Sequence, residues 1–395
     1  MRAHFVMTSE SLTDGHPDKL CDQISDAIVG RFLRQDAGAQ LVAECAVSTG
    51  IVFIAVKYLS EAAVDVSQVA RGVVRRVGYD TESFNADGCT VMVNLHEYPA
   101  PLAPLADERS LSEDEVDRVT AKNQATLFGF ACRQSPELMP LPIFLAHKLA
   151  RRLAEVRHSG ELSYLEPDGQ TQVGVEYTGH RPVRIHGLTL IASQRAIHTP
   201  SERQLRDDLL QAVVEPVFED EPLRPHDGTR IAINPEGVVG PGGPAFHAGL
   251  TGRKNGVDTY GEYARHSGAA LSGKDPSRID RVGAYAARWA AKNVVAAGLA
   301  DECEVCLSYS IGLAGPVSIR VQTFGTGHVT EDEIARRLEN ELDFRVAGIV
   351  RELGLRDLPR RDERGLYPKL AVYGHVGRPD LDLPWERTDR ADALR

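Results

Sequence analysis

Apolar and polar residues alternate along the first hundred residues in patterns that predict short strands and amphipathic helices. A period of two residues predicts a strand, and apolar residues three and four positions apart predict a helix with one buried face. The expected elements are a strand over 5–7, a helix that begins near residue 20, a hairpin over 41–58 with its turn at 48–50, a helix over 61–78 and a strand over 88–95.

The same patterns return after residue 138. They predict helices over 138–158, 201–215 and 281–297, and strands over 172–177, 182–194, 308–314 and 317–323. Two strands followed by one or two helices therefore recur about three times, which indicates α+β units whose sheets are covered by helices on one face. The length of 395 residues also favours two or three domains over one.

Residues 98–118 interrupt this order. Pro99, Pro101 and Pro104 come first, and the acidic run over 112–115 follows. Long connections without periodic structure are often lids or linkers. We expect this segment to be a mobile lid or linker.

The net charge of the chain limits the classes of partner that it can bind. The net charge is -11, and apolar and charged residues make up 42% and 26% of the chain, as in ordinary globular proteins. An acidic protein lacks the basic surface that nucleic acids and anionic membranes require. The chain has neither a signal-peptide core nor a run of 18 apolar residues. We therefore expect a cytoplasmic protein that binds neither nucleic acid nor membrane.

The six cysteines do not form a disulfide scaffold in so long a chain. Cys303 and Cys306 have the CxxC spacing, but they lie in an apolar run that predicts a buried strand. Without a second pair of cysteines, a core role is favoured over a zinc or redox role.

The glycine-rich segment over 242–281 contains eight glycines, four arginines and two lysines. Such a segment cannot be a packed helix, and it predicts turns that present N–H groups and cations to an anion. Residues 268–275 resemble a phosphate loop with Lys274 as its cation, although they do not match a Walker A motif. Asp275 and Asp280 are close enough in sequence to hold Mg²⁺ together with phosphate oxygens. A surface loop with solvated charges is the alternative interpretation.

Three further polar residues, His16, Asp18 and Lys19, lie at or near the N-terminus of the first predicted helix. Helix N-termini suit phosphate and metal chemistry. The alternative is that Asp18 only complements the helix dipole. Glu44 stands alone in an apolar strand, and a buried acid there would need a cation or hydrogen-bond donor nearby.

Three blocks of the sequence resemble the S-adenosylmethionine synthetase family. They are Ser9-Glu10-Ser11 with Gly15 to Ala27, Gly249 to Gly261, and Ser272 to Arg288. Shorter matches follow at 291–293, 296–300, 373–375 and 384–386. The likeness spans nearly the whole chain, which is identified as a divergent member of that family.

The resemblance implies a fold of three similar α+β domains related by pseudo-threefold symmetry, with sheets packed at a dimer interface. The expected segments are 1–100, 113–230 and 231–395. It also implies a homodimer or homotetramer with shared active sites.

The family reaction implied by the resemblance is attack of the methionine sulfur on C5′ of ATP. Triphosphate leaves and is then hydrolysed to pyrophosphate and phosphate, with help from two Mg²⁺ ions and K⁺. Prepositioned cations are the natural device for stabilising such a leaving group. The resemblance assigns catalysis to His16, Lys19, Arg253 and Lys274. It assigns ATP and phosphate binding to His16, Asn123, Gln170, Arg253, Lys254, Ser272 and Lys274, and metal binding to Asp18 and Asp280 (Mg²⁺) and Glu44 (K⁺).

The chain departs from the family pattern at several of these positions. Asn123 replaces the aspartate of an ATP-binding motif that has also lost its glycines, and Gln170 replaces a lysine. Four residues of the nucleophile subsite differ as well: Lys57 and His247 replace acids, Glu97 falls near the position of a glutamine, and Arg278 replaces a lysine. A lysine beside the methionine ammonium would be unfavourable, because like charges at about 4 Å repel by about 4 kcal/mol at an effective dielectric near 20.

These departures leave three hypotheses open. The first is an S-adenosylmethionine synthetase with a rearranged methionine subsite. The second is an adenosyltransferase with a different small-molecule nucleophile. The third is a nucleotide or triphosphate hydrolase, or an inactive partner subunit. Methionine is slightly favoured because it is the substrate of the family.

Overall fold

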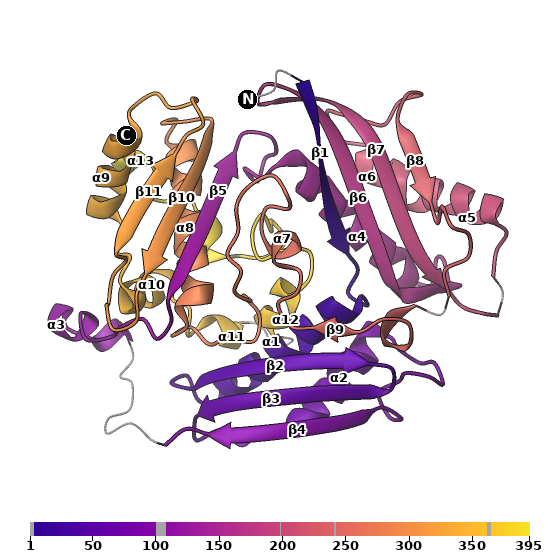
Figure 1. The fold of residues 1–395 in the computed structure, drawn as a ribbon, viewed down its shortest axis with the longest axis horizontal. Helices are drawn as coiled ribbons and strands as arrows, with labels where there is room; N and C mark the ends of the chain where they lie inside the picture. The colour runs from indigo at the N-terminus through magenta and orange to yellow at the C-terminus, as the bar shows by residue number, and fades with distance from the viewer. Residues whose placement is uncertain (1–3, 100–107, 198, 241, 362–364) are drawn as a thin grey trace.

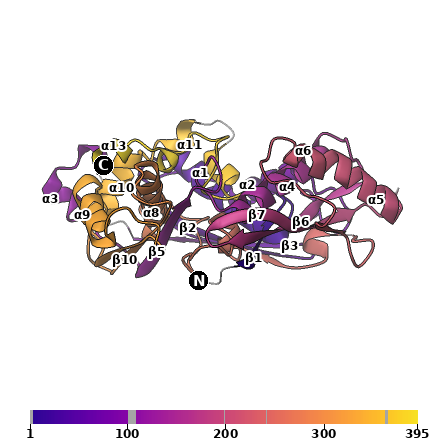
Figure 2. The ribbon, with the colours of Figure 1, turned by 90° about the horizontal axis from the view of Figure 1, so that it is seen from above.

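The computed structural model describes residues 4–99, 108–197, 199–240, 242–361 and 365–395, and contains three open sheets (Figure 1). Figure 2 shows the sheets on one side of a flat molecule and most helices on the other. The predicted α+β class, with sheets covered by helices on one face, is confirmed. The prediction of a lid falls partly on residues 100–107, which lie outside the described residues.

The first sheet has the strand order β4-β3-β2-β9. It consists of β2 (Gln40–Ser48), β3 (Ile51–Leu59), β4 (Thr90–Glu97) and the two-residue β9 (Gly249–Leu250). β2 and β3 form the predicted hairpin, whose turn contains Thr49 in the left-handed region at φ 51°. The helices α1 (Pro17–Gln35) and α2 (Val66–Val77) belong to the same part of the fold.

The second sheet has the order β1-β6-β7-β8. Its strands are β1 (His4–Leu12), β6 (Leu165–Thr178), β7 (Arg181–Gln194) and β8 (Arg230–Ile233). Helix α4 (Leu141–His158) packs on this sheet, as do the segments α5 (Glu202–Leu209) and α6 (Glu215–Phe218), which a π-helical turn over 210–214 joins. The predicted helix over 201–215 is therefore present but ends at Phe218.

The third sheet has the order β11-β10-β5. Its strands are β5 (Ala125–Cys132), β10 (Glu302–Tyr309) and β11 (Ser318–Gln322), and α8 (Ile279–Ala296) covers it. Cys303 is fully buried in β10, so its predicted core role is confirmed. The predicted strand over 308–314 is wrong beyond Tyr309, because the glycines at 312 and 315 and Pro316 end the strand pattern. Strand β5 and the helices α9 (Glu331–Glu341) and α10 (Val346–Leu353) were not predicted.

Each sheet takes a strand from a distant part of the chain. β1 pairs with β6, β5 pairs with β10, and β9 pairs with β2, all antiparallel. The sheets therefore do not coincide with contiguous segments, and the division into 1–100, 113–230 and 231–395 stays a prediction. The exchange also brings the glycine-rich segment, which contains β9, against α1.

The connection before β5 is attached to the last third of the chain where the structure describes it. A short helix, α3 (Glu113–Val116), begins with a capping box between Ser112 and Glu115. The carboxylate of Glu108 is buried and accepts a hydrogen bond of 2.8 Å from Nε of Arg356. Mobility is therefore not expected of residues 108–116.

Among the helices within the described residues, none combines the length and the apolar character needed to cross a membrane.

Candidate active site

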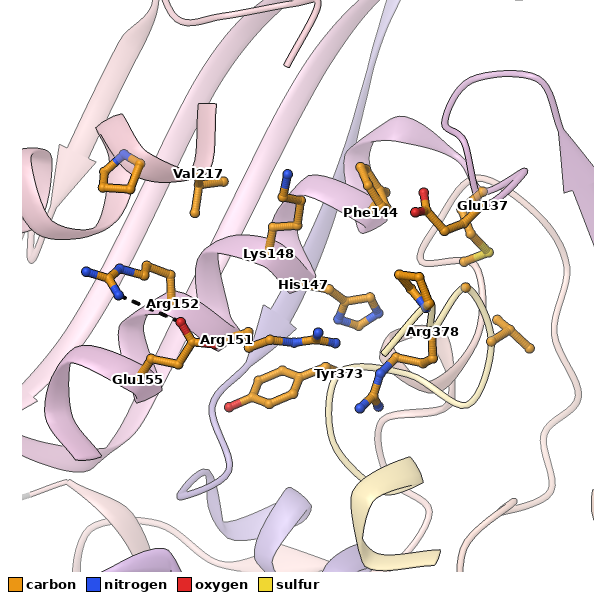
Figure 3. A pocket seen from close by; sticks show the side chains of 15 residues that line it. Glu137, Phe144, His147, Lys148, Arg151, Arg152, Glu155, Val217, Tyr373 and Arg378 are labelled. Carbon is orange, nitrogen blue, oxygen red and sulfur yellow. Dashed lines mark ion pairs between the residues drawn. The ribbon is translucent and has the colours of Figure 1, made fainter. Parts of the chain in front are cut away.

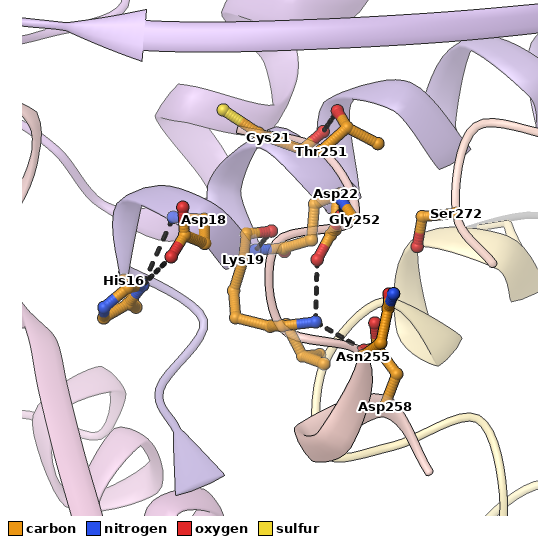
Figure 4. A network of polar contacts seen from close by, with 12 residues as sticks. His16, Asp18, Lys19, Cys21, Asp22, Thr251, Gly252, Asn255, Asp258 and Ser272 are labelled. Carbon is orange, nitrogen blue, oxygen red and sulfur yellow. Dashed lines mark hydrogen bonds and ion pairs between the residues drawn. The ribbon is translucent and has the colours of Figure 1, made fainter. Parts of the chain in front are cut away.

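The N-terminus of α1 places His16 at the centre of the candidate site (Figure 4). His16 is the N-cap, Pro17 follows at the first helical position, and Nδ1 of His16 accepts a hydrogen bond of 3.2 Å from the backbone N–H of Asp18. Burial lowers the pKa of His16 to about 3, so the imidazole is neutral. Because Nδ1 accepts, the hydrogen of the neutral ring is on Nε2, the atom that remains available to a ligand.

Three carboxylates along α1 hold the glycine-rich segment. Asp18, Asp22 and Asp26 follow one another at intervals of four residues, so they lie on one face of the helix. They accept backbone N–H groups from Leu250 at 3.0 Å, Gly252 at 2.7 Å and Gly273 at 2.8 Å, respectively. The predicted turns of this segment are confirmed, but several of its N–H groups bind the protein's own carboxylates. The i, i+4, i+8 spacing of aspartates is the sequence signal for this docking.

Gly249 permits the closest approach between the glycine-rich segment and α1. A Cβ atom at this position would lie 2.2 Å from the carbonyl carbon and oxygen of Pro17. We expect Gly249→Ala to destabilise the protein by about 1–3 kcal/mol or more, because the backbone of Pro17 cannot move as a side chain can. Turnover is expected to fall with it, because His16 adjoins the displaced backbone. Chemical denaturation and initial rates would measure both effects.

Gly268 provides the matched control for this prediction. It belongs to the same segment, but a Cβ there would meet nothing within 4 Å. Gly268→Ala is expected to leave stability within about 0.5 kcal/mol of the parent protein. Equal effects of the two substitutions would contradict the close-approach argument.

Lys19 does not lie where a phosphate could reach it. Its side chain is fully buried, and Nζ lies 2.7 Å from Asp22 and 2.5 Å from Asp258 (Figure 4). Burial alone would lower the pKa of Lys19, but the two carboxylates outweigh it and raise the pKa above its usual value. The expectation of Lys19 as a catalytic cation is therefore corrected: its charge neutralises two buried acids.

Asp275 is likewise structural. It is fully buried, and its carboxylate accepts N–H groups from Leu41 at 2.7 Å and from Ser277 at 2.6 Å. The bond from Leu41 attaches the loop over 272–275 to β2. The prediction that Asp275 binds Mg²⁺ is therefore wrong, because both of its carboxylate oxygens accept backbone N–H groups of the protein.

Lys274, Asn123 and Asp280 meet near this loop. Nζ of Lys274 lies 3.6 Å from Oδ2 of Asp280 and donates to the carbonyl of Ala270 at 2.7 Å. Asn123 donates a hydrogen bond of 2.8 Å from Nδ2 to Oδ1 of Asp280. The amide that replaces the family's aspartate thus contacts a predicted Mg²⁺ ligand directly.

His247 lies beside His16, with ring centroids 5.0 Å apart. Nε2 of His247 lies 2.9 Å from Oδ2 of Asp168, and this hydrogen bond raises the pKa of His247. The same oxygen accepts the N–H of Gly243 at 2.8 Å. Asp168 was missed by the sequence reasoning, although a lone acid between Pro167 and Gly169 is a recognisable signal.

Two cations of the glycine-rich segment stand at the edge of this cluster. Nη1 of Arg253 lies 3.9 Å from Oδ1 of Asp18, and its side chain is 57% exposed. Nζ of Lys254 lies 2.8 Å from Oε1 of Glu10. Both side chains are at least partly exposed and lie beside His16, so both can bind an anionic ligand.

Three other predicted residues lie in neighbouring segments. Ser272 is buried, with Oγ 3.4 Å from Nε2 of His375, and Arg278 lies 3.6 Å from Asp275. Gln170 lies in β6 between Leu12 and Ile191.

The remaining three predicted residues belong to the first sheet. Glu44 and Lys57 are exposed on β2 and β3, and Glu97 is exposed at the end of β4. Glu44 faces outward from its strand in the single chain, on the same side of the sheet as Lys57, so the expectation of its burial depends on what covers this face.

Asp18 and Asp280 fit Mg²⁺ by their chemistry. Asp18 accepts its hydrogen bond from Leu250 through Oδ1, which leaves Oδ2 as a candidate ligand. Asp280 accepts from Asn123 through Oδ1, and its Oδ2 would exchange the contact with Lys274 at 3.6 Å for the ion. Carboxylate oxygens together with phosphate oxygens are the ligands that Mg²⁺ prefers.

A separate cavity of about 410 Å³ lies between α4 and the segment around Tyr373 (Figure 3). Its walls carry Lys148, Arg151, Arg152 and Arg378, and each of these cations is paired with a carboxylate: Glu221, Asp380, Glu161 and Asp380, respectively. None of the predicted site residues, all of which are described, lines this cavity. The chemistry is assigned to the cluster around His16 because the predicted catalytic and phosphate-binding residues gather there and not at this cavity.

Comparison with known proteins gives matches along the whole chain. The N-terminal, central and C-terminal domains of S-adenosylmethionine synthetase match residues 4–100, 118–239 and 241–387. The S-adenosylmethionine synthase of Synechococcus sp. (strain JA-3-3Ab) is 48% identical over 406 residues, which cover 99% of this chain and 97% of the relative. That of Rippkaea orientalis is 47% identical over 409 residues, with 100% and 97% covered.

Proposed function

This chain belongs to the S-adenosylmethionine synthetase family, and we propose that it forms S-adenosylmethionine from ATP and methionine. The methionine sulfur forms a bond to C5′ while the bond from C5′ to the triphosphate oxygen breaks. The observation that carries the proposal is the neutral His16 beside Asp18, Arg253 and Lys254. The relatives do not favour a different nucleophile, a hydrolase or an inactive partner subunit.

His16 supplies a hydrogen-bond donor to the leaving group. Its Nε2–H is directed away from α1, since Nδ1 is held by the N–H of Asp18. The neutral ring keeps its Nε2 hydrogen, and this donor stabilises the negative charge that develops on a triphosphate oxygen.

Three cations would stabilise the rest of the triphosphate charge: Arg253, Lys254 and Lys274. Burial lowers the pKa of Lys274, but its neighbour Asp280 favours the charged form. Asp18 and Asp280 would hold Mg²⁺, which neutralises phosphate charge when bound. The assignment of two Mg²⁺ ions, and of K⁺ to Glu44, rests on the resemblance and is part of this proposal.

Lys57, His247, Glu97 and Arg278 would form an altered methionine subsite. The family pattern has a carboxylate at the position of His247. The imidazole of His247 cannot replace it, because its Nε2 already contacts Asp168. We expect Lys57→Glu combined with His247→Asp to lower the KM for methionine by about tenfold or more, since about 1.4 kcal/mol of relieved repulsion corresponds to tenfold. Steady-state rates at saturating ATP would measure it.

The KM for ATP provides the internal control, because neither substitution touches the cations assigned to triphosphate. An unchanged KM for methionine in the double variant would refute the placement of these two residues in the subsite.

The outer face of the first sheet supports a homodimer. Ile51, Phe53, Met92 and Leu250 point outward from it and are 44%, 45%, 51% and 48% exposed. Phe53 and Met92 are register partners, so they form a continuous apolar surface with their neighbours. Lys57 shares this face, and it would reach an active site across the subunit boundary. We propose a homodimer, or a homotetramer of such dimers, with shared active sites.

Charges on this face should prevent association. We expect Phe53→Glu with Met92→Glu to convert the dimer into a monomer, because a twofold interface brings like charges together from both copies. Light scattering after size exclusion would report the mass, and turnover should fall with dissociation. Ile197→Glu, on a loop residue that is 72% exposed, is the control expected to stay dimeric. A dimer that survives the double substitution would exclude this face as the interface.

The function is tested by incubating the purified protein with ATP, methionine, Mg²⁺ and K⁺ and following products by mass spectrometry. The proposal requires S-adenosylmethionine together with pyrophosphate and phosphate. Phosphate release without S-adenosylmethionine would overturn methionine as the nucleophile, and no consumption of ATP would overturn the reaction itself. A cytoplasmic location stays a prediction.

A further inference from the structure

Two imidazoles and a carboxylate lie together beside the N-terminus of α1. His16, Asp168 and His247 each offer one ligand atom, and these three atoms lie within 4.8 Å of one another. The residues come from the loop before α1, from β6 and from the glycine-rich segment, respectively. The side chains of His16 and Asp168 accept backbone N–H groups from Asp18 and Gly243, and His247 contacts Asp168, so all three are held in place.

Asp168 has an unused oxygen in this cluster. The residue is 6% exposed, and Oδ2 accepts hydrogen bonds from Gly243 and His247. Oδ1 is buried and has no hydrogen-bond partner within the described residues. A buried carboxylate oxygen without a partner is unfavourable, and a cation held by both oxygens of Asp168 would satisfy it.

The spacing of the ligand atoms suits a metal ion. Nε2 of His247 and Oδ2 of Asp168 are 2.9 Å apart, close to the separation of adjacent ligands around an ion with bonds of about 2.0–2.2 Å. An ion can therefore replace the hydrogen now shared by these atoms, which leaves to solvent. Nε2 of His16 becomes a ligand when the ring hydrogen moves from Nε2 to Nδ1, which then no longer accepts the N–H of Asp18.

Asp18 can support this ligand. Its Oδ2 lies 3.8 Å from Nδ1 of His16, so a small rotation would let it accept the hydrogen that Nδ1 carries once an ion occupies Nε2. Metal-bound histidines commonly donate their other ring N–H to a carboxylate in this way. The nearby cation Lys254 is balanced by Glu10 at 2.8 Å, which limits its repulsion of an ion.

We propose that His16, Asp168 and His247 bind one transition-metal ion of the Zn²⁺ type, and that this ion inhibits turnover. Two imidazole nitrogens and a carboxylate select Zn²⁺, Co²⁺ or Ni²⁺ over Mg²⁺, which prefers oxygen ligands. The ion binds Nε2 of His16 in place of its hydrogen, which moves to Nδ1, so the hydrogen-bond donor assigned to the triphosphate is lost. The inhibition rests on the proposed function, whereas the binding does not.

Co²⁺ is the probe that tests binding directly. The full-length protein, freed of metal by a chelator, is titrated with Co²⁺ in excess Mg²⁺, and visible absorption and equilibrium dialysis are recorded. We expect one Co²⁺ per subunit, with absorption bands typical of nitrogen ligation, and loss of both signals when Zn²⁺ is added. No Co²⁺ bound to the parent protein would overturn the proposal.

His247→Gln and Asp168→Asn locate the site. Each is expected to weaken Co²⁺ binding by about tenfold or more, because each removes one of three ligands. His158→Gln is the matched control: His158 also pairs with an aspartate, Asp14 at 2.7 Å, but it has no second imidazole partner among the described residues. Unchanged binding in both ligand variants, with circular dichroism showing that they are folded, would overturn the assignment.

Turnover is measured separately from binding. We expect Zn²⁺ to abolish S-adenosylmethionine formation by the parent protein and a chelator to restore it. If Co²⁺ binds but turnover is undiminished, the inhibitory role is overturned, whereas the assignment of the metal site stands. Absence of S-adenosylmethionine in the presence of Mg²⁺ and K⁺, with no Zn²⁺ or Co²⁺ added, would instead count against the proposed function, while the Co²⁺ signal would still report the site.

Discussion

Replacing His16 by asparagine is expected to lower kcat for S-adenosylmethionine formation by about 100- to 10,000-fold, the usual contribution of a positioned proton donor. Asparagine is a good N-cap residue, and its side-chain oxygen can take over the hydrogen bond from the N–H of Asp18. The substitution therefore removes Nε2–H while the start of α1 is kept. Stopped assays analysed by mass spectrometry would give kcat, and thermal unfolding would report the fold.

His16→Ala separates the two roles of this residue. It removes the N-cap as well as the donor, so we expect a similar loss of kcat together with about 0.5–2 kcal/mol of destabilisation. The KM for ATP should change little in both variants, because the cations that bind triphosphate remain. An asparagine variant that retains kcat within about tenfold would refute the donor role of His16.

Replacing Lys19 by methionine is expected to destabilise the protein by about 3–5 kcal/mol, as the removal of one partner from a buried ion pair commonly does. Lys19, Asp22 and Asp258 are fully buried, and methionine would leave two carboxylates without a cation. Because Asp22 and Asp258 also belong to the elements that carry the glycine-rich segment, the site should be disordered with them. Urea unfolding monitored by circular dichroism would give the free energy of unfolding.

Two comparisons test the structural role of Lys19. Adding Asp258→Asn to Lys19→Met should restore part of the lost stability, because one of the uncompensated charges is removed. Arg203→Met, which breaks an exposed pair with Asp207, should change stability by at most about 0.5 kcal/mol. A Lys19→Met variant with unchanged stability but no turnover would instead support the phosphate role inferred from the resemblance.

Local pattern determined much of the secondary structure and the candidate site. Two apolar runs over 41–47 and 51–56, separated by the turn residues over 48–50, define the hairpin of β2 and β3, because short apolar runs bounded by turn residues predict strands. The glycines of residues 242–281 exclude a packed helix there, since each adds backbone freedom that a helix would have to lose. His16 and Asp18 are recognisable at the start of α1 because helix capping is a local signal.

Tertiary structure alone decided what several charged residues do. The sequence places Lys19 beside Asp22, but only the folding of α7 (Asn255–Asp258) against α1 adds Asp258 and buries all three. Asp168 and His247 are 79 positions apart and meet because β6 and the glycine-rich segment converge. Burial and long-range partners set the charge and availability of a side chain, and neither is encoded in its neighbours along the chain.

The exchange of strands among the three sheets has the same origin. β1, β5 and β9 pair with strands far away in sequence, and their own patterns give no sign of the partner. Apolar alternation specifies that a strand buries one face, but many edges could accept it, and the choice depends on packing of the whole chain. The sequence by itself therefore determined the elements, the family and the start of the active site. The three-dimensional structure decided which residues are joined there, because contacts between distant segments form only when the sheets and helices pack together.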